Sequence, residues 1–223
     1  MTQNALSPPL PLSLSILEQV FGIPYFRDAP EGDLLDELVG TILSQNTSDT
    51  NSRRAFEVLK QRYATWESVL NADPDQLEET IRAGGLAAIK SRRIQVILQE
   101  IQEREGSLSL HRLSTVSNQE AMKYLLSLKG VGCKTAACLL MFGLGRDLCP
   151  VDTHVHRVAN RLGWVKTRQP DHTYEALQDQ IPVGRAYSLH INLIRLGKIV
   201  CTARQPNCTH CPLAAYCPSA GIS

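Results

Sequence analysis

The apolar residues of this chain recur at helical spacing along most of its length. One stripe runs from Leu34 to Leu43, and another runs from Ile94 to Ile101 behind the basic cluster Lys90, Arg92 and Arg93. Apolar residues three and four positions apart share one face of an α-helix. Because no stretch alternates in the way that a half-buried strand requires, the sequence predicts an all-α fold.

Capping residues mark where several helices begin. Ser117 and Glu120 have capping-box spacing, and the polar run "SQNTSDTN" supplies caps for a helix around Phe56 and Leu59. Two further helices are expected at about 153–162 and 184–200. The leading residues 1–13, which include "SPPLPL", are interpreted as a flexible arm.

Composition limits the classes of protein to which the chain can belong. With 223 residues, 43% of them hydrophobic, it can form one large domain or two small ones. No run approaches the roughly 18 apolar residues of a membrane span, and the first residues lack the basic region of a secretory signal. We therefore expect no membrane partner and a cytoplasmic location. The net charge of +1 means that any affinity for nucleic acid must come from local patches.

Four of the seven cysteines crowd into the C-terminal tail with the spacing C-x6-C-x2-C-x5-C. They are Cys201, Cys208, Cys211 and Cys217. Thiolates clustered in one loop suit zinc or an iron–sulfur cluster. Only the central pair is closely spaced, which favours one cluster wrapped by a single loop over zinc. The other three, Cys133, Cys138 and Cys149, are expected to be buried small side chains.

The segment "LKGVGCKT" places a tight glycine turn between two helices. A phosphate-binding loop of the nucleotide-binding type needs four residues between its glycines and a preceding strand, so that interpretation is weak. A helix-hairpin-helix over about residues 118–142 fits better. Its backbone N–H groups around Gly130 and Gly132 would hold a DNA phosphate without reading a base, although a turn of this kind can also serve packing alone.

Lys134 lies in the first turn of the second hairpin helix. The positive end of the helix dipole would tend to lower the pKa of its amine, as a nucleophile requires, and a bound phosphate would oppose this effect. Asp152 in "CPVDTHVHR" can return to Lys134, because residues 143–151 span up to about 30 Å when extended. Asp152 could equally be an N-cap, and both roles can coexist. His154 and His156 are expected to be structural.

The hairpin "LKGVGCKTA", the "VDTH" segment and the four-cysteine tail together resemble the endonuclease III family of DNA glycosylases, from about Leu34 to Cys217. The resemblance implies two helical domains that flank a DNA-binding groove. Residues 27–146 would form a six-helix domain with the hairpin. Residues 14–26 and 147–223 would form the other, with a [4Fe–4S] cluster held by the four tail cysteines. It also implies a monomer, associated with the nucleoid, whose partner is double-stranded DNA containing damaged bases or abasic sites.

The resemblance implies a chemistry as well. Lys134 matches the lysine that attacks C1′ of a flipped-out nucleotide, expels an oxidised pyrimidine and forms a Schiff base. Asp152 matches the aspartate that assists the lysine and stabilises charge at the sugar. β-Elimination then cuts the strand 3′ to the lesion, so the chain is expected to be a bifunctional glycosylase and abasic-site lyase.

The same resemblance indicates residues that contact DNA, and some of them depart from the family pattern. Asn46 would fill the void left by the flipped base, where the family commonly has the longer glutamine. Leu86 would wedge into the stack, but the usual Tyr-Asn after it is Ala87-Ala88, and Gly84 replaces a bulkier apolar residue. The hairpin residues and an arginine of the cluster loop would contact phosphates; they are Lys129, Gly130, Val131, Gly132 and Arg204.

Further departures bear on substrate choice. Gln205 and Asn207 stand at positions of the cluster loop that are often basic in relatives, and Cys133 stands beside Lys134 where many relatives carry arginine. Together the departures predict a weak or unusual lesion preference. They leave open a glycosylase for mismatched or deaminated bases with little lyase activity. A non-catalytic iron–sulfur protein that binds DNA is the alternative from another class.

Overall fold

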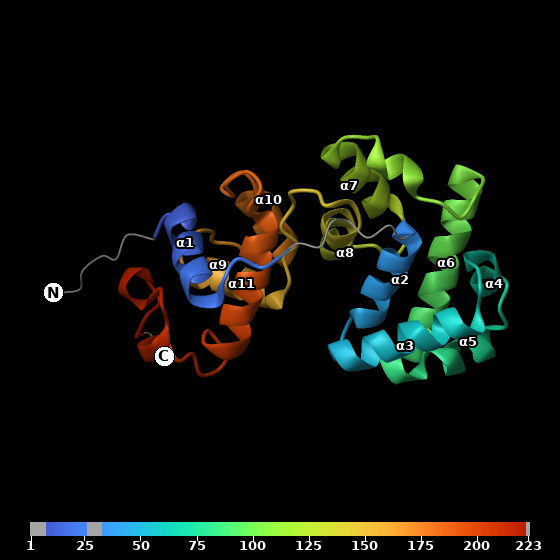
Figure 1. Cartoon of the computed structure of the whole chain (residues 1–223), viewed down its shortest axis with the longest axis horizontal. Helices are drawn as coiled ribbons and strands as arrows, with labels where there is room; N and C mark the ends of the chain where they lie inside the picture. Colours follow the sequence, from blue (N-terminus) through green and yellow to red (C-terminus); the bar gives the residue numbers. More distant parts are fainter. Residues whose placement is uncertain (1–7, 26–32, 222–223) are drawn as a thin grey trace. The chain divides into compact units, whose positions relative to one another are not determined.

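The computed structural model describes residues 8–25 and 33–221, which contain helices and no strand (Figure 1). The all-α prediction is thus confirmed for the described part of the chain. The chain folds as two compact units, one made of Met1–Asp28 with Asp147–Ser223 and the other of Ala29–Arg146. Within the described ranges, no helix combines the length and the apolar character that crossing a bilayer requires.

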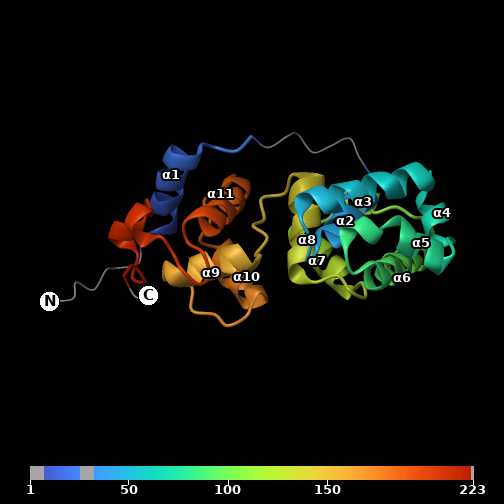
Figure 2. The ribbon, with the colours of Figure 1, turned by 90° about the horizontal axis from the view of Figure 1, so that it is seen from below.

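The unit Ala29–Arg146 is built around α6, the helix Ala87–Glu105. Ile94, Ile97, Leu98 and Ile101 of α6 are fully buried, as the stripe predicts. α6 packs against helices on several sides (Figure 2). The other helices of the unit are α2 Leu34–Ser44, α3 Asp49–Arg62, α4 Trp66–Leu70, α5 Pro74–Thr80, α7 Asn118–Ser127 and α8 Cys133–Cys138.

The predicted caps are present in this unit. Ser48 accepts a hydrogen bond from the backbone N–H of Asn51 at the start of α3, and Ser117 and Glu120 form the capping box of α7. The second hairpin helix is not uniform, because α8 passes at Leu139 into a π-helical turn that ends at Gly143. The predicted helix-hairpin-helix over about residues 118–142 therefore corresponds to α7, a glycine turn, and α8 with its π-helical extension.

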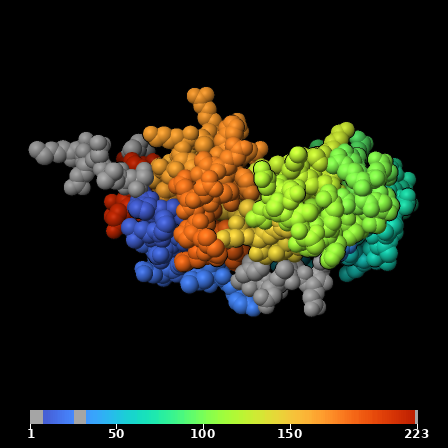
Figure 3. All heavy atoms as spheres, turned by 90° about the horizontal axis from the view of Figure 1, so that it is seen from above, coloured from blue at the N-terminus to red at the C-terminus, as the bar shows by residue number. Residues whose placement is uncertain are grey.

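The other unit consists of α1 Leu10–Phe21, α9 Thr153–Arg161, α10 Pro170–Gln178 and α11 Ala186–Ile199, followed by the cysteine tail. Its core joins the two ends of the chain, because Leu14 and Leu17 of α1 pack in one cluster with Leu189 and Leu193 of α11. Figure 3 shows α1, in blue, lying against the orange of α11. Buried Glu18 reinforces this contact by accepting hydrogen bonds from Ser188 and Arg185.

The flexible arm predicted for residues 1–13 is wrong for its last part. Helix α1 already begins at Leu10, which is buried, and the indole N–H of Trp164 donates to the carbonyl of Pro8 at 2.9 Å. Pro9 is instead the N-cap of α1, and Pro11 lies in its first turn, where a missing N–H costs little. Residues 26 and 27, where the first domain boundary was placed, lie outside the described ranges. Helix α10 was not predicted at all.

Candidate active site and cluster-binding loop

The turn between α7 and α8 has two buried apolar side chains and an otherwise solvent-exposed backbone. Leu128 and Val131 are buried, whereas Lys129, Gly130 and Gly132 are exposed. Gly130 has φ +90°, a conformation that glycine adopts without strain. The N–H of Val131 bonds to the carbonyl of Leu128, and the N–H of Lys129 bonds to the Glu100 carboxylate at 2.8 Å. The exposed backbone at Gly130 and Gly132 is therefore the part of this turn that can bind an anion.

Lys134 lies half-buried in the first turn of α8 and has a carboxyl neighbour in its own unit. Burial raises the pKa of Glu37 on α2, while a hydrogen bond from Thr41 and the positive charge of Lys134 both act to lower it. The two side chains are thus close enough to interact electrostatically. Sequence reasoning missed Glu37, since nothing in the spacing of α2 indicates that α8 packs beside it. Glu37 also lines an open cavity of about 440 Å³ with Gly40 and Phe56.

Asp152 is the N-cap of α9. Its Oδ1 accepts hydrogen bonds from the backbone N–H groups of His154 and Val155, both at 2.8 Å. The segment that leads to Asp152 is held at two points. The Gln178 amide exchanges hydrogen bonds with the backbone of Cys149, and the ring of buried His190 bonds to the carbonyl of Pro150 at 2.8 Å. Sequence reasoning missed both holding residues.

Asp152 and Lys134 belong to different units, so their juxtaposition stays a prediction. The two histidines of the motif make contacts inside their own unit. His154 interacts with Arg157 at 3.1 Å, and His156 with Thr173 at 2.7 Å. These contacts agree with the structural roles expected for both residues.

Two of the residues expected to enter DNA have unusual backbones. Asn46, just after α2, has φ +53°, and Leu86, just before α6, has φ +51°. Both are exposed. The departure at position 84 has a packing reason, because a Cβ on Gly84 would lie 3.2 Å from the Cβ of Ala55 on α3. A bulkier side chain does not fit there unless α3 shifts.

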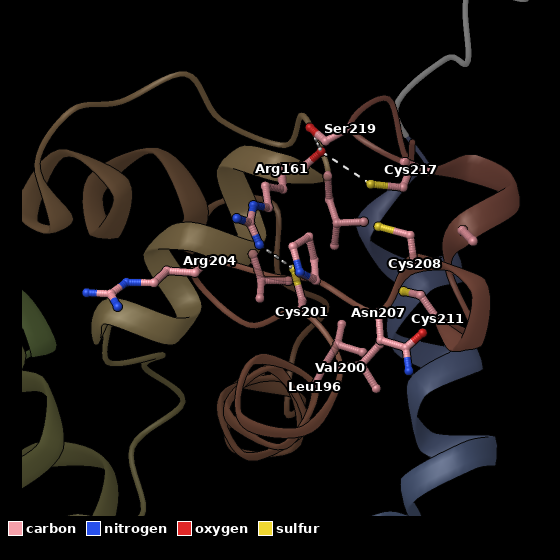
Figure 4. Close-up of a pocket in the computed structure, with 15 residues that line it drawn as sticks. Arg161, Leu196, Val200, Cys201, Arg204, Asn207, Cys208, Cys211, Cys217 and Ser219 are labelled. Atoms are coloured by element: carbon pink, nitrogen blue, oxygen red, sulfur yellow. Dashed lines mark hydrogen bonds between the residues drawn. The ribbon is translucent and has the colours of Figure 1, made fainter. Parts of the chain in front are cut away.

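The four tail cysteines line one cavity of about 310 Å³, with their sulfur atoms directed into it (Figure 4). Arg161 of α9 closes one side, since its guanidinium donates to Cys201 Sγ at 3.3 Å and its carbonyl accepts from Cys217 Sγ at 3.4 Å. Arg204 is exposed, and its guanidinium points away from the sulfur atoms (Figure 4). The other three cysteines are buried, as expected.

The chemistry of this cavity fits a cluster better than a single ion. Burial raises the pKa of the Cys211 and Cys217 thiols, and the neighbouring thiols act in the same direction. Four thiolates in such a place need a strongly cationic centre. Four thiols around a cavity of about 310 Å³ suit a group with several irons, which each cysteine binds at a different corner.

Comparison with known proteins agrees with the helical hairpin and with the four-cysteine loop. Residues 39–182 match the HhH-GPD superfamily of base excision DNA repair proteins, and residues 201–217 match the iron–sulfur binding domain of endonuclease III. Endonuclease III of Thermotoga maritima is 35% identical over 191 residues, which are 86% of this chain and 85% of that protein. The chain belongs to the endonuclease III family. The predicted [4Fe–4S] cofactor is confirmed at the level of the family.

This endonuclease III family member is also similar to a plant relative and to a solved structure. A candidate DNA glycosylase of Arabidopsis thaliana is 40% identical over 198 residues, 88% of this chain, and the chain spans 65% of that relative's length. A solved structure of a non-covalent endonuclease III–DNA complex has a TM-score of 0.77 at 25% identity, and the match covers 93% of each chain.

Proposed function

We propose that this endonuclease III family member removes oxidised pyrimidines from duplex DNA and cleaves the resulting abasic site through a Schiff base on Lys134. The observation that carries the proposal is the position of Lys134, half-buried in the first turn of α8 directly after an exposed glycine turn. An amine in this position can reach a sugar while the turn holds the neighbouring phosphate. The similarity to an endonuclease III–DNA complex supports double-stranded DNA as the partner.

The chemistry assigns a task to each of the two predicted catalytic residues. Neutral Lys134 Nζ attacks C1′, the N-glycosidic bond breaks, and the base leaves with the bonding electrons and a proton. Opening of the sugar ring gives an imine between Nζ and C1′. Loss of a C2′ proton then breaks the C3′–O3′ bond, which releases the downstream strand with a 5′-phosphate and leaves the unsaturated sugar on the 3′ end of the upstream strand. The Asp152 carboxylate accepts the lysine proton and stabilises positive charge on the sugar; its second oxygen, Oδ2, is not used in capping α9.

The glycine turn supplies binding without sequence selectivity. The exposed N–H groups of Gly130 and Gly132 bind one phosphate, and the Lys129 ammonium adds charge beside them. The backbone N–H of Lys129 does not take part, because Glu100 occupies it. Arg204 extends the phosphate contacts from the cluster loop, where its guanidinium points outward. The cluster binds Cys201, Cys208, Cys211 and Cys217 and shapes that loop.

Borohydride trapping tests the proposal. The protein is incubated with duplexes that contain thymine glycol or an abasic site, and the imine is reduced to a stable covalent adduct. Wild-type protein is expected to form the adduct on both DNAs, and Lys134→Ala is expected to form none while still binding DNA. Lys129→Ala is the matched control, since it removes an exposed lysine five residues away. It should weaken binding and leave trapping intact at saturating protein.

Two outcomes would contradict the proposal in different ways. Cleavage limited to uracil or thymine mispairs, without an adduct, would indicate a mismatch-type glycosylase with little lyase activity. DNA binding with no product on any lesion would indicate a non-catalytic iron–sulfur protein.

A further inference from the structure

Asn46 and Leu86 share a backbone feature that no other described residue except glycine has. Both adopt positive φ, at +53° and +51°. The left-handed region is unfavourable for a side chain with a Cβ, and for leucine no local hydrogen bond compensates. Leu86 is also 51% exposed, so burial of its side chain does not explain the strain. Strain of this kind persists only where surrounding contacts impose it, and it concentrates at functional sites.

A buried lysine bonds to the backbone close to both of these residues. Lys90 on α6 is 2% exposed, and its Nζ donates to the carbonyl of Leu43 at 2.7 Å and to the carbonyl of Gly84 at 2.8 Å. One carbonyl lies three residues before Asn46 and the other two residues before Leu86. A single ammonium therefore joins the bases of the two strained loops, which are separated by about 40 residues in the sequence.

Burial of the Lys90 ammonium costs folding free energy that an apolar side chain at the same position would not cost. Among the described residues, no carboxylate forms an ion pair with it, and the charge of nearby Arg93 opposes it. A buried ammonium without an acidic partner costs more than an apolar side chain of the same size. The two carbonyls that it binds compensate for this cost. Leu43 lies in the last turn of α2 and Gly84 ends a short 3-10 helix, so each carbonyl stands where the chain enters one of the two loops.

Arg93, one turn later on α6, connects the first loop to the hairpin. Its Nη1 donates to Gln45 Oε1 at 2.8 Å, and the Gln45 amide donates in turn to Thr135 Oγ1 at 3.2 Å. Thr135 is the residue after Lys134. The Arg93 side chain also lies against the glycine turn, where a Cβ on Gly130 would approach three of its atoms at 3.2 Å.

We propose that Lys90 and Arg93 are positioning residues for extrusion of the damaged base. From adjacent turns of α6 they hold the Asn46 and Leu86 loops in the strained conformation that presents both side chains to the base stack, in register with the hairpin. Leu86 acts as the apolar wedge and Asn46 provides an amide to the space that the base leaves. This inference rests on the proposed function, because it assumes a duplex substrate whose base must be moved.

The test compares two DNAs that differ in whether a base must be displaced. One duplex carries a paired damaged base and the other an abasic site, and single-turnover adduct formation is measured on each. Lys90→Met is expected to lose about ten-fold on the damaged base, which corresponds to about 1.4 kcal/mol, and much less on the abasic site. Arg93→Met is expected to show the same selectivity to a smaller extent. It also keeps the test valid if Lys90→Met folds poorly, since Arg93 is only half-buried.

A matched control lies on the same helix. The Gln95 amide donates to the carbonyls of Val69, Leu70 and Ala72, at 3.3, 3.2 and 2.9 Å, and so ties α6 to α4 and the residues after it. Gln95→Leu removes a comparable tie without touching either loop, and any loss should be equal on the two DNAs. In a Leu86→Ala background, Lys90→Met should have little further effect on the damaged base, because both act on one step.

The outcomes separate this inference from the proposed function. Equal losses by Lys90→Met on both DNAs, or full additivity with Leu86→Ala, would overturn it. Base opening is followed independently of catalysis by placing 2-aminopurine next to the damaged base and measuring the rise in its fluorescence as stacking is lost. If wild-type protein opened the lesion but formed no adduct, and Lys90→Met abolished the opening, the proposed function would fail and the positioning role would stand.

Discussion

Replacement of Asp152 by asparagine and by alanine separates its observed role as a helix cap from its proposed role in catalysis. Oδ1 caps α9 through two hydrogen bonds of 2.8 Å, to His154 and Val155. Asparagine caps a helix about as well as aspartate, so Asp152→Asn should change the free energy of unfolding by only a few tenths of a kcal/mol. Alanine removes the acceptor, and Asp152→Ala should cost about 1 kcal/mol, within a range of roughly 0.5–2. Both variants lose the carboxylate, so both should lose catalysis by a factor of about 10²–10⁴.

The measurements are denaturant unfolding and single-turnover trapping on abasic DNA. The expected order of stability is wild type, then Asp152→Asn close behind, then Asp152→Ala, whereas the two variants should be equally inactive. If Asp152→Asn kept activity within about three-fold of wild type, the residue would be an N-cap only, because a proton acceptor contributes far more. Equal stability of Asp152→Asn and Asp152→Ala would refute the capping argument instead.

Three other predictions concern packing, pH dependence and the cluster. Gly197→Ala places a Cβ 2.8 Å from the Cβ of His154. Overpacking of about 1–3 kcal/mol should exceed the gain of up to about 1 kcal/mol in helix propensity, so denaturant unfolding should show a net loss; unchanged stability would contradict this. Burial raises the pKa of Glu37 above its ordinary 4.5, so its ionised form destabilises the fold at neutral pH. Glu37→Gln should therefore raise the free energy of unfolding at pH 7, with the gain lost as the pH falls through the raised pKa toward 4.5; a gain independent of pH would exclude this cause. Anaerobically purified protein should be brown and contain iron and sulfide, and Cys211→Ser should lose both; a colourless protein with stoichiometric zinc would contradict the assignment.

The parts of the fold that the sequence predicts well are those encoded locally. Helical stripes such as Ile94–Ile101 give the helices and their buried faces, and side chains such as Ser117 give helix starts, because both signals lie within one or two turns. The cysteine spacing is also local, since one short loop supplies all four thiols to the cavity. The glycine turn before Lys134 belongs to the same class.

The parts that the sequence does not predict depend on packing between distant segments. Prolines ahead of Leu10 are typical of a linker, and only the contact of α1 with α11 shows that they begin a helix. α10 has just two buried residues, Thr173 and Leu177, and no side-chain cap, so neither an apolar stripe nor a capping residue marks it in the sequence. Glu37 becomes a neighbour of Lys134 only through the packing of α2 on α8.

The basic cluster of α6 shows that such packing decides which groups a charged side chain contacts. In the sequence, Lys90, Arg92 and Arg93 form one basic cluster, and nothing in their spacing distinguishes one cation from another. In the structure, only Arg92 is exposed, while Lys90 is buried and Arg93 is half-buried with its guanidinium bonded to Gln45. Two of the three charges therefore bind the protein's own carbonyl and amide oxygens. We therefore expect Lys90 and Arg93 to affect DNA binding only through the loops that they contact, and Arg92 to be the member of the cluster that is free to contact a phosphate directly.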